Sequence, residues 1–112
     1  TETALRIAGG FGGGMHCGEL CGALTGGVMV VGAAKGHYIE NDTGAKQNCT
    51  AATVAFTNEF KARHGCIICR DLLGVDISTP EGQVQFAEQN MGETKCMGYV
   101  TTAVEVLEEQ GY

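Results

Sequence analysis

Aromatic residues are scarce in this sequence, which contains no tryptophan, four phenylalanines and three tyrosines among its 112 residues. Because aromatic side chains supply much of a typical core, the core here must be packed from Ala, Val, Leu, Met and Cys. Eighteen glycines accompany this shortage and favour helices whose backbones approach closely. With 44% hydrophobic residues at this length, we expect a single domain over residues 1–112.

Positive charge is also in short supply. The sequence contains seven Lys and Arg residues but 13 Asp and Glu residues, which gives a formal net charge of −6 and a pI near 4.9. Binding to a phosphate backbone depends on Lys and Arg that neutralise phosphates. We therefore expect no nucleic-acid partner.

No hydrophobic run is long enough to span a bilayer. The longest uncharged run, Leu20 to Ala34, has 15 residues, whereas a membrane helix needs about 20. No basic and apolar signal segment opens the sequence. We therefore expect a cytoplasmic protein that does not contact a membrane and whose cysteines are reduced or bind metal, rather than forming a disulfide framework.

The hydrophobic pattern has a helical period and no sustained alternation at period two. It predicts an all-α fold, a small bundle of about four to five helices with glycine-rich close packing. Gly9–Gly14 should stop a first helix, and Thr79 before Pro80 should begin another. The expected helical segments are Thr3–Ala8, about Met15–Ala34, about Thr43–Arg63, a short turn at Cys66–Leu73, about Pro80–Met91 and about Lys95–Gln110.

Each of the longer segments carries an apolar stripe. The stripe of the last helix should consist of Cys96, Val100, Ala103, Val104 and Leu107. The second segment also carries glycines at a strict interval of four, namely Gly14, Gly18, Gly22 and Gly26. Such a ridge allows close approach of a neighbouring backbone. It favours either tight packing within the chain or room for an inorganic cofactor or for the second subunit of a homodimer.

Six cysteines are the strongest chemical signal in the sequence. Four form two close pairs, Cys17-x-x-x-Cys21 and Cys66-x-x-Cys69, whose spacings would align their sulfurs on helices. Together with Cys96, these pairs indicate a shared metal or redox centre. Cys49 lies alone on the third apolar stripe and is best interpreted as a buried hydrophobic residue.

Three kinds of sulfur chemistry remain open. An iron–sulfur cluster, held by thiolates from several elements, is preferred, with Cys21, Cys66, Cys69 and Cys96 as first ligands and Cys17 as a substitute. The alternatives are thiol–disulfide exchange by Cys66 and Cys69 and a zinc-stabilised interaction module. Covalent haem is disfavoured because Arg70 follows Cys69 where a histidine would be needed.

Other residues could assist such a centre. The glycine run can direct backbone amides at cluster sulfurs through Gly12, Gly13 and Gly14, and Arg70 can offset thiolate charge. His16 and His64 are weaker candidates as ligands or proton carriers. The partner would be a redox protein or a small molecule, and no pattern requires an open site for catalysis.

Several blocks together resemble one family. They are Gly10-Phe11-Gly12-Gly13-Gly14-Met15, Cys21-Gly22-Ala23-Leu24-Thr25-Gly26-Gly27, Phe56-x-x-x-Phe60, Cys69-Arg70-Asp71-Leu72-Leu73-Gly74, and Cys96 before a valine-rich helix. In order and spacing this chain resembles the redox-active proteins named for the signature C_GCAxxG_C_C.

The resemblance implies a small helical protein, frequent in anaerobes, with a redox or iron–sulfur role. Cys21, Cys69 and Cys96 match the downstream cysteines of that family, while Cys17, Cys49 and Cys66 are additions. The Cys-x-Gly-Cys-Ala opening is expected before Thr3 and does not occur in this sequence, where Asn48-Cys49-Thr50-Ala51 echoes it weakly.

Overall fold

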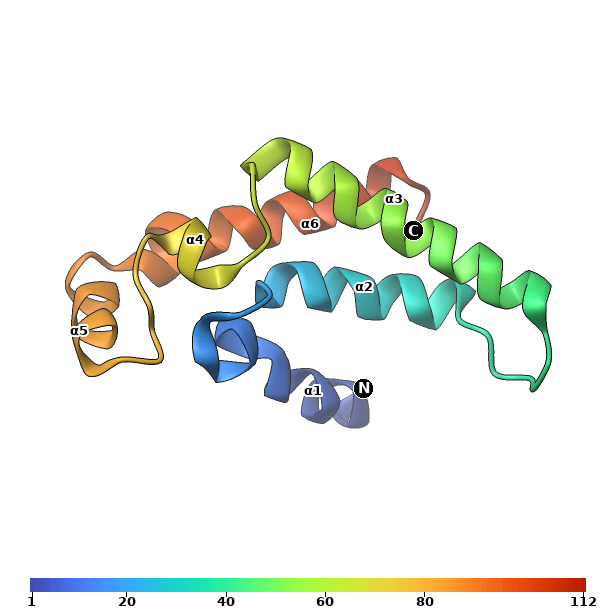
Figure 1. The fold of residues 1–112 in the computed structure, drawn as a ribbon, viewed down its shortest axis with the longest axis horizontal. Coiled ribbons are helices and arrows are strands. Elements are labelled where there is room, and N and C mark those ends of the chain that lie inside the picture. The colour runs from blue at the N-terminus through green and yellow to red at the C-terminus, as the bar shows by residue number, and fades with distance from the viewer.

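The computed structural model describes residues 1–112 and confirms an all-α fold without strands. It contains six α-helices rather than four to five, joined in part by short irregular helical turns (Figure 1). The helices are α1 Glu2–Ala8, α2 Gly22–Lys35, α3 Thr43–His64, α4 Cys69–Leu73, α5 Pro80–Glu88 and α6 Met97–Glu109; the turns are η1 Gly9–Phe11, η2 Gly14–Gly18 and η3 Gly92–Cys96.

The three long helices α2, α3 and α6 pack against one another and form the main core (Figure 1). Phe56 and Phe60 of α3 are completely buried there, next to Val31 of α2 and Val106 of α6. Two of the four phenylalanines thus lie at the centre of the core, although aromatic residues are scarce in the sequence. A smaller cluster of Cys69, Leu73 and Met91 fills the end of the bundle near α4 and α5.

Glycine allows one close helix contact, but at a position outside the predicted ridge. A Cβ atom built on Gly27 of α2 would lie 2.1 Å from the Phe56 ring of α3. Gly27 therefore lets the aromatic ring rest against the α2 backbone. Gly14 and Gly18 belong to no α-helix and have φ values of +62° and +76°, so the predicted ridge does not form.

The prediction that a helix begins near Met15 is wrong. Met15 and His16 adopt left-handed backbone angles, with φ of 59° and 58°, and α2 begins only at Gly22. Glycine pays a high entropic cost in a helix, and three of them precede Met15 directly. The cause is also long-range, because Leu20 forms an antiparallel bridge with Ile68.

The other helix boundaries agree more closely with the sequence. Asp42 caps α3 by accepting from the Ala45 amide, and Gly65 ends it with φ of +83°. Thr79 accepts from the Gly82 amide, and Pro80 takes the first position of α5 as predicted. The turn expected at Cys66–Leu73 is helical only from Cys69 onward. No helix has the length and apolar character needed to cross a bilayer.

The predicted stripe of the last helix is partly wrong. Ala103 is buried, but Val100 and Val104 are 53% and 47% exposed, and Val106 takes their place in the core. Because every face of α6 carries some apolar residues, their spacing alone could not identify the inward face. This helix therefore presents valines to its surroundings.

Candidate redox centre

The centre is built around the short antiparallel bridge between Leu20 and Ile68. The Cys21 amide donates to the Ile67 carbonyl at 2.9 Å, and the Cys69 amide donates to the Glu19 carbonyl at 2.5 Å. Alternation across this pairing places Cys21 and Cys69 on the same face, as diagonal neighbours. Both are free thiols.

The glycine loop leaves room for this pairing. A Cβ atom on Gly14 would lie 2.4 Å from the Glu19 amide nitrogen, whose hydrogen is donated to the Gly14 carbonyl at 3.0 Å. Only glycine fits at this close approach, where φ is also positive. The loop therefore holds the strand-like segment that carries Cys21.

A third cysteine, Cys96, reaches the same region from a distant part of the sequence. Cys96 ends η3 directly before α6, and two side chains near it bind the last carbonyls of α4. The Tyr99 hydroxyl donates to Leu72 O at 2.9 Å, and Lys95 Nζ donates to Leu73 O at 3.1 Å. These bonds satisfy carbonyls that a helix end leaves without partners, and they fix Cys96 beside α4.

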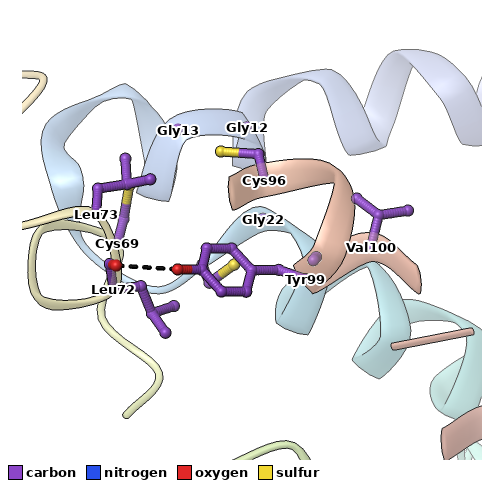
Figure 2. Close-up of a pocket in the computed structure, with 11 residues that line it drawn as sticks. Gly12, Gly13, Gly22, Cys69, Leu72, Leu73, Cys96, Tyr99 and Val100 are labelled. Atoms are coloured by element: carbon purple, nitrogen blue, oxygen red, sulfur yellow. Dashed lines mark hydrogen bonds between the residues drawn. The ribbon is translucent and has the colours of Figure 1, made fainter. Parts of the chain in front are cut away.

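The three thiols line one cavity of about 240 Å³ (Figure 2). Figure 2 shows Cys69 and Cys96 on opposite sides of the opening, with the Tyr99 ring between α4 and α6. Most of the wall is apolar, and it contains no carboxylate, imidazole or guanidinium group. The lining residues are Gly12, Gly13, Cys21, Gly22, Ala23, Cys69, Leu72, Leu73, Cys96, Tyr99 and Val100.

Burial in this wall raises the pKa of two of the three thiols, Cys69 and Cys96. The pKa of Cys69 is raised from 9.0 to about 11, first by burial and then by the nearby charges that Cys21, Cys96 and Asp76 would carry. The pKa of Cys96 is also raised, by burial and by Cys21. Both shifts follow from the cost of placing an anion in an apolar site beside other anions.

Tyr99 is the residue that the sequence analysis missed. Its pKa is raised by burial and then by the thiolate charges of Cys96, Cys21, Cys66 and Cys69. The phenol shares the cavity wall with Cys21, Cys69 and Cys96, and Cys66 lies within electrostatic range of it. The sequence did contain a signal for this residue, because a side chain three positions after Cys96 lies one helical turn away, on the same face.

The remaining sulfur and histidine candidates lie apart from the cavity wall. Cys17 is exposed, and its Sγ donates to the Gly14 carbonyl at 3.3 Å. Cys17 and Cys21 are therefore not paired along a helix as the spacing predicted. Cys49 lies half-buried on α3. His16 is exposed and its Nε2 pairs with Gly9 O at 3.1 Å.

Cys66 and His64 do not line the cavity wall. Cys66 precedes the bridge and stands outside α4, so its predicted i,i+3 alignment with Cys69 is wrong. His64 packs edge-on against the Tyr99 ring, with ring centroids 4.8 Å apart, and its Nε2 pairs with Thr102 Oγ1 at 2.8 Å. Burial and the Arg63 charge lower its pKa.

The predicted cofactor contacts divide in the same way. Gly12 and Gly13 line the cavity. Gly14 does not, and it instead allows the close backbone approach to Glu19. Arg70 directs its guanidinium away from the cavity, to Glu19 Oε1 at 2.6 Å and to the Gly18 carbonyl at 3.3 Å. Its charge is therefore matched by a carboxylate at the surface.

The spacing of the donors bears on what they could hold. No three His, Cys, Asp or Glu side chains stand close enough to share one metal ion, whereas zinc requires each sulfur within about 2.3 Å of the ion. The cavity is larger than a single ion and its donors are soft sulfurs. Soft sulfur donors of this kind are the usual ligands of zinc and of iron–sulfur clusters.

Comparison with known proteins gives one match. The family model described as "Putative redox-active protein (C_GCAxxG_C_C)" covers residues 1–110. No curated protein and no solved structure matches the chain.

Proposed function

Because the chain belongs to the C_GCAxxG_C_C family of redox-active proteins, we propose that it is a redox protein holding an iron–sulfur cluster in the cavity between α2, α4 and α6. The observation that carries this proposal is the convergence of Cys21, Cys69 and Cys96 on one apolar cavity. Each comes from a different element, as cluster ligands commonly do.

The raised pKa of the Cys69 thiol disfavours a role for this residue as the nucleophile in thiol exchange. Nucleophilic cysteines have lowered pKa values, whereas Cys69 has a pKa of about 11. A thiol that binds metal loses its proton outright, so a raised pKa does not prevent ligation.

Cys66 is the candidate for a fourth ligand. Its thiolate lies near enough to Tyr99 to raise the phenol pKa, together with the three cavity cysteines. Cys17 and Cys49 have no such relation to the cavity. This separates the four preferred ligands from the other two cysteines.

The chain's own residues would then have distinct tasks. The bound cluster would accept and release single electrons. Leu72, Leu73 and Val100 would exclude water and keep the site apolar. Tyr99 would keep its proton at the phenol oxygen, since that proton is donated to Leu72 O, and its raised pKa disfavours a further negative charge among thiolates.

The proposal is tested by isolating the protein without oxygen and reconstituting it with iron and sulfide. We expect a brown protein with a charge-transfer absorption band and with bound iron and acid-labile sulfide in equal amounts. Cys21→Ser, Cys69→Ser and Cys96→Ser should each lose most of the iron, and Cys66→Ser should lose it as well.

Cys49→Ser and Cys17→Ser are the matched controls and should retain their iron. A colourless protein without iron after reconstitution would contradict the proposal. Stoichiometric zinc in place of iron would favour a zinc module instead. Equal iron loss from Cys49→Ser and Cys69→Ser would overturn the ligand assignment.

A further inference from the structure

The chain exposes more surface than a folded monomer of its mass should. Its accessible surface is 6918 Å², whereas a monomer of 11.7 kDa is expected to expose about 5,900 Å². Only 14 of 112 residues are buried. The excess of about 1,000 Å² is similar to the roughly 800 Å² that each partner buries in a standard protein interface.

The shape of the molecule agrees with this excess. The radius of gyration is 15.1 Å, against about 13 Å for a compact domain of this length. The molecule measures 48 × 27 × 22 Å, and α1 extends beside the three-helix core without entering it (Figure 1). A second chain could fill the space that this elongated fold leaves.

One exposed apolar surface is a groove between α2 and α6. Val30, Val100 and Val104 line it and are 44%, 53% and 47% exposed. No charged residue lines the groove, whose remaining wall consists of glycine, alanine and leucine residues of α2 and α6. It continues into the thiol cavity, because Gly22, Ala23 and Val100 line both.

The second exposed apolar surface is α1. None of its residues is buried, and Leu5 and Ile7 are 75% and 58% exposed. Most helical stability in proteins comes from packing an apolar face against other elements, and α1 packs chiefly against the short turn η1. The apolar side chains of α1 therefore have no packing partner in the core of the chain.

Charge favours a match between these two surfaces. The only charged side chains of α1, Glu2 and Arg6, form an ion pair at 2.8 Å, so the helix is neutral within a chain of net charge −6. The groove is uncharged. Packing α1 into such a groove would bury no unpaired charge.

We propose that two copies of the chain form a symmetric dimer in which α1 of each copy packs into the α2/α6 groove of the other. This exchange would cover the groove where it meets the thiol cavity and would shield that side from water. Two-fold pairing uses the same pair of surfaces twice, as closed dimers do. The assembly does not depend on a bound metal.

Sedimentation equilibrium of the whole chain tests this assembly. We expect the mass to be twice the 11.7 kDa of one chain. Leu5→Glu on α1 and Val104→Glu in the groove should each give a monomer with unchanged helical circular dichroism. Val84→Glu, at an exposed valine of α5 outside the groove, is the matched control and should remain dimeric.

Mixing the two monomeric variants tests the reciprocal contact itself. A Leu5→Glu chain retains an intact groove, and a Val104→Glu chain retains an intact α1, so an equimolar mixture should form heterodimers with one native contact. Continued monomers in the mixture, a dimeric Val104→Glu variant or a monomeric unmodified chain would each overturn the proposal. Cys69→Ser should lose iron while keeping the dimer mass, which separates this test from that of the cluster.

Discussion

The Tyr99 hydroxyl donates a hydrogen bond to the Leu72 carbonyl oxygen at 2.9 Å, and this bond joins the first turn of α6 to the end of α4. Cys69 begins α4 and Cys96 immediately precedes α6. The bond therefore fixes the separation of two thiols that come from segments 27 residues apart in the sequence.

Removing this hydroxyl should loosen the cavity. Tyr99→Phe keeps the ring but leaves the Leu72 carbonyl without this donor, and we expect a loss of about 1 kcal/mol in the free energy of unfolding. Tyr112→Phe is the control, since its hydroxyl makes no hydrogen bond within the chain. Urea denaturation of both variants measures the difference, and equal stability would show that the bond contributes nothing.

The Cys69 thiol should react slowly in the metal-free protein. Its pKa of about 11 leaves a thiolate fraction at pH 8 roughly a hundredfold smaller than that of a thiol with pKa 9. We expect alkylation by iodoacetamide, followed by peptide mass spectrometry, to accelerate steadily from about pH 8 to pH 11.

The exposed Cys17 is the internal reference for this measurement and should be alkylated first. Unfolding the protein in urea should abolish the difference between the two cysteines, because the shift arises mainly from burial. A Cys69 rate that reaches its plateau below pH 9 would contradict the raised pKa.

Gly27 should be required for the packing of α2 on α3. A Cβ atom there would meet the Phe56 ring at 2.1 Å, so Gly27→Ala should destabilise the fold by about 1–3 kcal/mol. Gly32→Ala on the same helix has no atom within 4 Å of its new methyl group and should stabilise the fold by about 0.5–1 kcal/mol. Denaturant titration distinguishes them, and a neutral Gly27→Ala would mean that the ring moves freely aside.

His64 should make stability depend on pH. Burial and the Arg63 charge lower its folded-state pKa, so protons bind the unfolded chain more readily below about pH 6.5. The free energy of unfolding should therefore be highest above that pH and should decrease as the pH falls below it. His64→Gln should reduce the change in unfolding midpoint between about pH 7.5 and pH 5.5, whereas His37→Gln in an exposed loop should leave it unchanged.

Local signals determined much of the helical architecture. The limits of α3 follow from Asp42 at its start and Gly65 at its end, and the start of α5 follows from Thr79 and Pro80, whereas its end lies at Glu88 rather than near Met91. Capping and left-handed glycine act within a few residues, so the sequence contains everything needed to predict them. The apolar stripe likewise identified Phe56 and Phe60 as core residues.

The start of α2 could not be predicted in this way. The stripe from Cys17 to Leu24 has a helical period, yet the chain pairs Leu20 with Ile68 and turns at Gly14 with a left-handed backbone. That pairing joins residues 48 positions apart, and its hydrogen bonds replace those of a helix. As a result Cys17 is exposed and Cys21 is buried.

By itself, then, the sequence determined an all-α chain rich in thiols, with Cys21, Cys69 and Cys96 marked by their resemblance to one family. Tertiary structure alone decided that these three thiols share a cavity, that Tyr99 stands among them, and that Cys17 and Cys49 lie elsewhere. The reason is the range of the forces involved. Helix propensity and capping act between neighbours, whereas the cavity forms only where α2, α4 and α6 meet.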